Sequence, residues 1–379
     1  MTSEADTPAG GEMRCLHLAS GDLWAGAEVQ VCNLLTRLHG MDGVRAFAVL
    51  LNEGELAERL RAAGVPVTVL DETRLSTWRI LRGVRHILRR ERIGLIHTHR
   101  RKENFIGGLA ARLYGCPSVQ TVHGRNEHAP RPGDLRARLL QGVDWISARF
   151  LQRRIVAVSE ILGSELAARY PPGRVAVIPN GVDLAPLRGI AADTASRPLN
   201  GRPMEIAVVG RLVPVKRVDL VIRIAAELER THPGVFRFHV YGEGPQRNSL
   251  EEMAGRMLPA GVLSFEGFRT DVTRRLAEHD ALLITSDHEG LPTNLLEALA
   301  LGRPVVARAV GEIPLVLGSA LQGACVQGEN PATFAGRLMA TREAILSGVL
   351  DRAALQARAA AYDADATADQ YLTLYAKLY

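Results

Sequence analysis

Residues 283–307 read LITSDHEGLPTNLLEALALGRPVVA, and this stretch decides the expected fold. Its apolar start predicts a strand over residues 282–285, which a polar loop follows. Helical spacing of the leucines then predicts a helix over residues 293–301, and a second strand is expected over residues 304–307. A strand, a helix and a further strand in this order are typical of a parallel sheet.

The predicted helix carries the features of an anion site. We expect the Thr293 hydroxyl to cap its first turn and Gly302 to end it. Free amide groups and the positive end of the helix dipole then lie beside a strand end, which favours phosphate. Two carboxylates flank the site, Glu289 in the loop and Glu297 in the helix, with seven residues between them. Since Glu297 lies among apolar residues, we expect neutral hydroxyl donors to meet it.

Composition indicates a globular chain of two domains. The 379 residues are 47% hydrophobic and 23% charged, and no apolar run is long enough to span a membrane. The four cysteines are scattered without metal-site spacing, which predicts buried thiols in a reducing compartment. Residues 1–12 are small and polar and do not resemble a signal peptide. These features predict a cytoplasmic protein, or at most a peripheral one at the inner face of the membrane.

The net charge of +5 is concentrated in the first half of the chain. Residues 77–92 place Trp78, Leu81, Val84 and Leu88 at helical spacing among arginines. Such a helix either rests on an anionic membrane or packs its apolar stripe on the core, and both interpretations stay open. An aromatic content of 5% and the lack of a recognised module argue against a nucleic-acid partner.

Strands and helices are predicted to alternate along the whole chain, which indicates two doubly wound sheets. The expected domains are a disordered leader over 1–12, a first Rossmann-like domain over 13–185, a linker over 186–203, a second Rossmann-like domain over 204–361 and a terminal helix over 362–379. In the first domain, strands are expected at 14–19, 44–51, 67–70, 95–98, 118–122, 155–158 and 175–178. Helices are expected there at 27–39, 55–63, 77–91, 104–114, 135–151 and 160–170.

The stretch EGLPTNLLEALALGRPVV at residues 289–306 resembles the E-x7-E signature of retaining GT-B glycosyltransferases of family 4. The resemblance implies two Rossmann-like domains that face each other across a cleft, with the terminal helix crossing back to the first domain. It also implies that Glu289 approaches the donor sugar and that Glu297 holds the nucleotide ribose. The turn between them would bind the donor diphosphate, through Gly290, Thr293, Asn294 and Leu295.

Two further segments resemble this family. VVGRLVPVKRVDL at residues 208–220 places Arg211 and Lys216 where the diphosphate is bound, although the family usually has glycine where this chain has Arg217. Fixed cations there would stabilise the negative charge of the departing diphosphate. In the first domain, Gly26 matches a glycine whose backbone approaches the donor, while Ala25 replaces the glycine that usually precedes it.

The remaining candidates follow predicted strands. The resemblance implies that His123 contacts the transferred sugar and that Phe268 lies near the nucleotide base. His97 and His99 fall on one side of their strand by period-two alternation, and His99 and Arg125 are candidates for the acceptor pocket. The G-x-G at residues 242–244 is expected to be a structural turn, and Asp363 and Asp365 to be helix-start acids rather than metal ligands.

The sequence therefore predicts a retaining, metal-independent glycosyltransferase without a cofactor. Its donor would be a nucleoside-diphosphate sugar and its acceptor a glycan or lipid-linked sugar, in surface polysaccharide or glycolipid synthesis. Two alternatives remain, a catalytically silent GT-B module that binds nucleotide or glycan, and an NAD-type dinucleotide binder. The second alternative lacks the complete G-x-G-x-x-G fingerprint.

Overall fold

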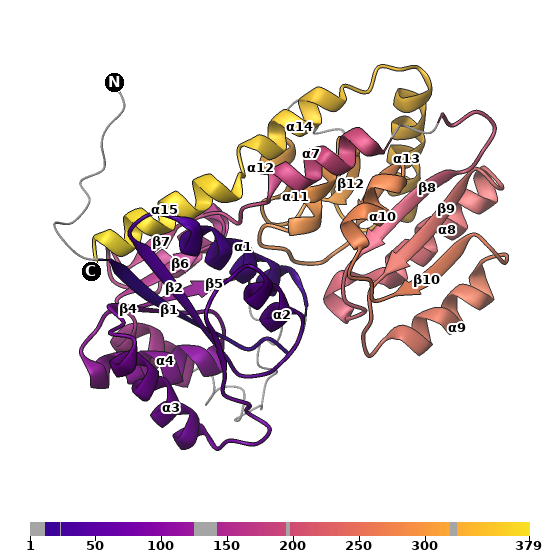
Figure 1. Cartoon of the computed structure of the whole chain (residues 1–379). Coiled ribbons are helices and arrows are strands. Elements are labelled where there is room, and N and C mark those ends of the chain that lie inside the picture. The colour runs from indigo at the N-terminus through magenta and orange to yellow at the C-terminus, as the bar shows by residue number, and fades with distance from the viewer. Residues whose placement is uncertain (1–11, 23, 125–141, 195–197, 319–323) are drawn as a thin grey trace, which may run out of the picture. The chain divides into compact units, whose positions relative to one another are not determined.

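The computed structural model describes residues 12–22, 24–124, 142–194, 198–318 and 324–379. The chain divides into two compact units, one formed by Met1–Gly181 with Ala364–Tyr379 and the other by Val182–Asp363. Each unit contains a parallel sheet with helices on both faces, as Figure 1 shows. The predicted α/β class with two Rossmann-like domains is confirmed.

The first sheet has seven strands in the order β3-β2-β1-β4-β5-β6-β7. They are β1 (Met13–Ala19), β2 (Val44–Leu50), β3 (Val67–Val69), β4 (Leu95–Thr98), β5 (Ser118–Val122), β6 (Arg154–Ala157) and β7 (Val175–Val177). All seven predicted strands of this half are present, and their ends agree to within one residue. Short apolar runs predict them well because strands buried on both faces have few polar positions.

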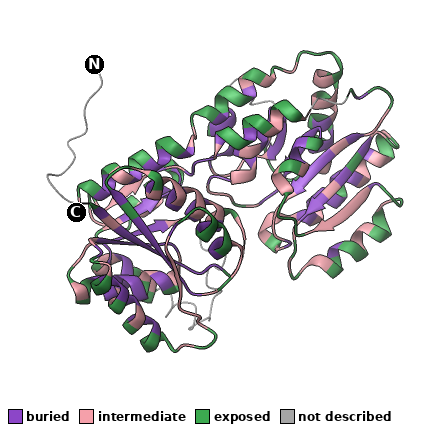
Figure 2. Ribbon diagram, viewed as in Figure 1, coloured by how far each residue is buried: buried purple, intermediate pink, exposed green. Residues whose placement is uncertain are grey.

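Helices of the first unit cover two large cores, one on each face of its sheet. The helices are α1 (Gly26–Gly40), α2 (Glu55–Ala62), α3 (Thr77–Arg90), α4 (Arg101–Tyr114), the π-helix η1 (Ser147–Leu151), α6 (Glu160–Ala167) and α15 (Ala364–Ala376). One large core packs α1, α2 and α15 on the sheet, the other packs α3 and α4, and a small third cluster lies beside α6. Figure 2 shows the buried strands in purple between the exposed outer faces of the helices. Part of the helix predicted over residues 135–151 lies outside the described residues.

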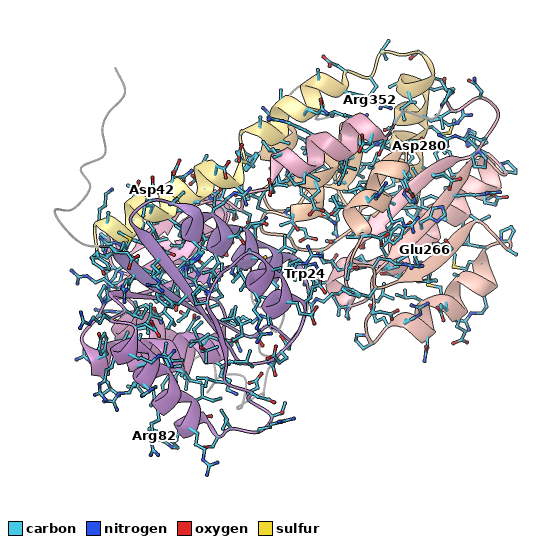
Figure 3. The ribbon with its side chains drawn as sticks, in the orientation of Figure 1. Trp24, Asp42, Arg82, Glu266, Asp280 and Arg352 are labelled. Carbon is cyan, nitrogen blue, oxygen red and sulfur yellow. The ribbon has the colours of Figure 1, made fainter. Side chains whose placement is uncertain are left out.

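The structure shows where the apolar stripe of helix α3 lies. Leu81, Val84 and Leu88 are buried in the core, and only Trp78 of the predicted stripe is exposed, at 73%. Four of its arginines are exposed and Arg85 is partly buried, and Figure 3 shows Arg82 extending away from the helix. The stripe therefore faces the core.

The second sheet has six strands in the order β10-β9-β8-β11-β12-β13. They are β8 (Met204–Val209), β9 (Phe236–Tyr241), β10 (Leu263–Gly267), β11 (Ala281–Ile284), β12 (Val305–Arg308) and β13 (Cys325–Val326). Its helices are α7 (Leu184–Asp193), the 3-10 turn η2 (Pro214–Lys216), α8 (Val218–Thr231), α9 (Arg247–Met257), α10 (Val272–Glu278), α11 (Thr293–Ala300), α12 (Ile313–Leu317), α13 (Pro331–Leu346) and α14 (Arg352–Ala360).

The segment expected to be an irregular linker differs in the structure. Residues 186–203 include most of α7, whose start is capped where the Asp183 carboxylate accepts from the Ala185 amide at 3.3 Å. Leu184 and Leu187 are buried in the core that includes α11. A short helix with two core residues shows little periodicity, and its role in packing is therefore not visible in the sequence.

The end of the chain returns to the first unit through α15. Where the chain passes between the units, the Val182 amide donates to the Tyr362 carbonyl at 2.8 Å. Ala368, Tyr371 and Tyr375 are then buried in the core beside α1. None of the helices in the described ranges combines the length and apolar composition needed to cross a membrane.

Candidate active site

Two loops that follow the neighbouring parallel strands β8 and β11 lie against each other. The Thr285 hydroxyl donates to the carbonyl oxygens of Lys216 and Arg217, at 3.0 and 3.1 Å. The Asp287 amide donates to the Val215 carbonyl at 2.8 Å. Because the carboxyl ends of parallel strands share one edge of a sheet, these loops form the edge where ligands bind in such folds.

An ion pair joins the two loops at this edge. Lys216 Nζ lies 2.6 Å from Glu289 Oε1, and the two side chains are 25% and 11% exposed. The aliphatic part of Lys216 passes over Gly210, where a Cβ atom would stand 3.5 Å from its Cδ. The sequence predicted a functional role for each of these charges. It did not predict that they pair, because 73 positions separate them.

Helix α11 starts differently from the prediction. Pro292 occupies the cap position, Thr293 is the first helical residue, and no side chain caps this end. The prediction that Thr293 caps the helix is therefore wrong by one residue, because the proline favours the extended backbone that a cap position needs. The first-turn amides have no partners within the helix. At the other end, Gly302 has φ +66°, so its predicted role as the stop is confirmed.

Glu297 is a carboxylate without a partner among the described residues. Its neighbours Leu296, Ala298 and Leu299 are buried. Desolvation by burial raises the pKa of Glu297 to about 7. A hydroxyl group of a ligand would supply the hydrogen bond that this carboxylate lacks.

The other predicted donor-binding residues follow the same strand ends or lie in α11. Phe268 comes directly after β10 and is 51% exposed, and Arg211 is partly exposed after β8. Leu295 is fully buried, so that only its backbone is available to a ligand. The Asn294 side-chain amide donates to the Val209 carbonyl at 2.9 Å, and thus fixes α11 against β8.

Gly290 and the G-x-G turn contact other parts of the second unit. The Gly290 carbonyl accepts from the Glu312 amide at 3.1 Å. A Cβ at Gly242 would stand 2.0 Å from the Gly210 carbonyl oxygen, and one at Gly244 would stand 2.4 Å from the Leu212 oxygen. The two turn glycines therefore allow a close backbone approach to the loop that carries Lys216, as expected for a structural turn.

The first-domain candidates belong to the first unit. Gly26 begins α1, and Arg125 lies outside the described residues. His99 and His123 line a small pocket in this unit, together with Asn33, Asn180, Thr367 and Tyr371. The rings of His97 and His99 lie 4.3 Å apart, consistent with the expected alternation. The predicted site residues are thus divided between the two units.

Sequence reasoning missed two features beside these histidines. His17 on β1 is fully buried and pairs in register with His97 on β4, and it makes a hydrogen bond to His99. Glu28 is also buried and forms an ion pair with Arg100, which lies 3.2 Å from Asp22 as well. Burial raises the pKa of Glu28, and the charge of Arg100 opposes that rise. The available signal for His17 was a histidine between the apolar residues Leu16 and Leu18 of the strand MRCLHLA.

The paired acids at Asp363 and Asp365 lie on either side of the unit boundary. Asp365 is in the first turn of α15, where Arg37 Nε donates to it at 2.6 Å. An acid at a helix start that is paired with arginine has a structural explanation, in agreement with the prediction.

The fold is that of the GT-B glycosyltransferases, and family models match both halves of the chain. A model described as "Glycosyltransferase Family 4" matches residues 24–186, and one described as "Glycosyl transferases group 1" matches residues 190–343. The chain therefore belongs to the group 1 glycosyltransferases of family 4.

Several curated relatives share one name. The D-inositol 3-phosphate glycosyltransferase of Acidothermus cellulolyticus is 30% identical over 305 residues, which are 74% of this chain and 66% of that protein. The protein of the same name from Actinosynnema mirum is 28% identical over 74% of this chain and 72% of its own length. The chain thus spans about two thirds of the length of these relatives.

Solved structures share the fold across nearly the whole chain. Anabaena Alr3699/HepE in complex with UDP-glucose has a TM-score of 0.81 and 19% identity, covering 97% of this chain and all of that one. Sucrose-phosphate synthase from Thermosynechococcus elongatus has a TM-score of 0.75 and 17% identity, covering 96% and 99%. At these identities the comparison supports the fold alone.

Proposed function

We propose that this chain transfers a sugar from a nucleoside-diphosphate sugar to an acceptor hydroxyl, with retention of anomeric configuration and without a metal ion. The observation that best supports this proposal is the Lys216–Glu289 ion pair, 2.6 Å long, beside the uncapped start of α11. A cation, a helix dipole and free amide groups at one sheet edge favour a diphosphate. Together they supply the positive field that a divalent ion would otherwise provide.

In the proposed reaction the bond between the anomeric carbon and the diphosphate oxygen breaks, while the acceptor oxygen bonds to the same face of that carbon. The acceptor proton passes to the departing phosphate oxygen. Lys216 and Arg211 stabilise the negative charge on the diphosphate, and so do the backbone amides of Gly290, Thr293, Asn294 and Leu295. Glu289 positions the donor sugar once the diphosphate takes over its contact with Lys216.

The remaining donor contacts follow from single features of the site. Glu297 accepts hydrogen bonds from the ribose hydroxyls, and these replace the protein partner that it lacks among the described residues. Phe268 lies near the base, His123 contacts the transferred sugar, and the backbone of Gly26 approaches the donor.

The acceptor is proposed to be a sugar or polyol hydroxyl, in surface polysaccharide or glycolipid synthesis. Relatives named D-inositol 3-phosphate glycosyltransferase support a polyol acceptor, and a similar fold in complex with UDP-glucose supports a hexose donor. The proposed acceptor residues are His99, which lines the first-unit pocket, and Arg125, which lies outside the described residues.

We place the protein in the cytoplasm, with peripheral contact to anionic membrane through the outer face of α3. Exposed Trp78 and the arginines of that face support this contact. Sedimentation with phosphatidylglycerol vesicles tests it. Trp78→Ala should reduce binding several-fold, while Met257→Ala, a change at an exposed residue of the second unit, should not.

A thermal-shift panel of nucleotides and nucleotide sugars, without added metal, tests the function. One nucleoside diphosphate should raise the melting temperature of the wild type, and much less that of Lys216→Ala or Glu297→Ala. The matched control is Lys102→Ala, because Lys102 forms an ion pair with Glu72 in the first unit. Binding without turnover across an acceptor panel would favour the catalytically silent module. A response to NAD alone would contradict the proposal.

A further inference from the structure

Buried side chains of the first unit form one continuous hydrogen-bonded chain. It runs from His123 Nε2 to His99 Nδ1 at 3.2 Å, and from His99 Nε2 to His17 Nδ1 at 3.1 Å. His17 Nε2 then lies 3.3 Å from the Tyr375 hydroxyl, which is 2.5 Å from His97 Nδ1. The chain therefore joins the β5 end of the sheet to α15.

Neutral imidazole rings give such a chain a direction. A neutral ring donates from one nitrogen and accepts at the other, whereas a protonated ring donates from both. A charged ring would therefore break the chain, and burial also disfavours the charge, lowering the pKa of His17 to about 3 and that of His123 to about 4. Once one proton in the chain is placed, every other proton is determined.

The short contact between the Tyr375 hydroxyl and His97 Nδ1 fixes the position of the first proton. A phenol is a stronger acid than a neutral imidazole N–H, so the short contact to His97 is the one in which Tyr375 donates. Its oxygen then accepts from His17 Nε2–H. His17 Nδ1 is then unprotonated and can only accept, so His99 donates from Nε2 to it. His123 donates from Nε2 to His99, and its Nδ1 is left without a proton.

The free nitrogen belongs to the last residue of the chain, His123. His123 Nδ1 is shielded from solvent and has no hydrogen-bond partner among the described residues. His123 lines the pocket whose other walls include Asn33 and Thr367. A hydroxyl group is the simplest ligand that donates one hydrogen bond to a neutral nitrogen there.

We infer that Tyr375, acting through His17 and His99, holds His123 in the tautomer whose Nδ1 accepts a hydrogen bond from a substrate hydroxyl. For this hydroxyl, Tyr375, His17 and His99 act as positioning residues, and His123 is the residue of the chain that contacts it. The part that concerns substrate rests on the proposed function. The part that concerns the tautomer does not.

A metal centre is the alternative use of this cluster. His17, His97 and His99 place nitrogen atoms within 4.8 Å of one another. All six of their ring nitrogens already have hydrogen-bond partners, however, and the trio includes no carboxylate to balance a divalent charge. The hydrogen-bonded chain therefore explains the cluster better.

Long-range ¹H–¹⁵N spectra of the ¹⁵N-histidine-labelled full chain, recorded without substrate, test the tautomer. The wild type should show His123 with Nδ1 unprotonated and Nε2 protonated, assigned by the signal that His123→Asn removes. In Tyr375→Phe the buried His17 N–H loses its acceptor, so the chain should reverse and protonate His123 Nδ1. The control Tyr379→Phe removes a hydroxyl just beyond α15, one that accepts from the Arg14 amide, and should leave the His123 signals unchanged.

Protonated Nδ1 in wild-type His123 would overturn the inference, and this result needs no variant to fold. Unchanged His123 signals in a folded Tyr375→Phe would overturn it as well, since a merely structural tyrosine would change only the melting temperature. With a donor sugar identified, kcat/KM should fall about five- to tenfold in Tyr375→Phe and stay level in Tyr379→Phe. If wild type shows no transfer at all, the proposed function fails while the tautomer result still stands.

Discussion

Glu297 lowers the stability of the folded protein, because it keeps a carboxylate in apolar surroundings, but it leaves that carboxylate available to a ligand. Its pKa is raised from 4.5 to about 7, so the folded state prefers the neutral form and loses stability as the pH rises through that range. Glu297→Gln should therefore be more stable than wild type at pH 8, by about 1–2 kcal/mol, and nearly equal to it at pH 5. Urea unfolding at both pH values measures this difference.

The same substitution should weaken nucleoside diphosphate binding about tenfold at pH 8, because an amide is a poorer acceptor for ribose hydroxyls than a carboxylate. Calorimetric titration measures the affinity. Glu343→Gln, at a carboxylate on α13 that is 65% exposed, serves as the control and should change neither quantity. A less stable Glu297→Gln at pH 8 would contradict this account.

Arg217 carries backbone strain where the family usually has glycine. Its φ is +51°, in the left-handed region, and its guanidinium forms ion pairs with Asp219, Asp287 and Glu329. Glycine and alanine substitutions lose the same ion pairs and differ mainly in backbone cost. Arg217→Gly should therefore be more stable than Arg217→Ala by about 1 kcal/mol.

Thermal or urea unfolding of both variants tests this order. Arg223, an exposed residue within α8, supplies the opposite control. There the glycine variant should be less stable than the alanine variant by about 1 kcal/mol, because the backbone is helical. Equal stabilities of Arg217→Gly and Arg217→Ala would show that the left-handed backbone costs nothing at this position.

At the scale of elements, most strands and the longer helices were predictable, while α12 and β13 were not. Runs such as MEIAVV in β8 and the leucine spacing in α11 show their period within the element itself. α12 has five residues and β13 has two, too few to show any period. Site residues were predictable where one motif contains them, as with Glu289 and Glu297. The His17–Tyr375 contact joins residues 358 positions apart, which no local pattern reveals.

Three adjacent strands of the second sheet share a charged cluster. His239 on β9 lies 2.7 Å from Glu205 on β8 and 3.2 Å from Glu266 on β10, the last labelled in Figure 3. The hydrogen bond to Glu205 raises the pKa of His239 and lowers the pKa of Glu205, while the hydrogen bond from the Ser264 hydroxyl, followed by that to His239, lowers the pKa of Glu266. Protonated His239 therefore stabilises the folded state fully below the pKa that it has in the unfolded chain. This stabilisation is lost as the pH rises through the pKa of His239 in the folded protein.

Wild type should accordingly lose more stability between pH 6 and pH 8.5 than His239→Gln, by up to about 1 kcal/mol at this partly exposed site. Urea midpoints at the two pH values measure the difference. His86→Gln, at an exposed position on α3, should follow the wild type. If His239→Gln shows the full wild-type pH dependence, the cluster does not control this part of the stability profile.

At the scale of the whole molecule, one unit is built from a single continuous segment and should fold alone, whereas the other needs a segment from the far end of the chain. All residues of Val182–Asp363 are contiguous, and its two cores draw on this segment alone. The first unit needs α15 from the far end of the chain, because Ala368, Tyr371, Leu374 and Tyr375 fill its core beside α1. Burying each large side chain contributes about 1.5–3 kcal/mol, so the tail supplies a large part of the 5–15 kcal/mol that is typical of a domain.

A fragment of residues 182–363 should therefore fold alone, with a cooperative melting transition and dispersed NMR signals, and should still bind nucleoside diphosphate. A fragment of residues 1–181 should lack both signs of folding until a peptide of residues 364–379 is added. The same peptide with Tyr375→Ala should restore folding less well, at matched concentration, because it leaves a cavity in the core. Independent folding of residues 1–181 without the peptide would show that α15 only covers a core that is already complete.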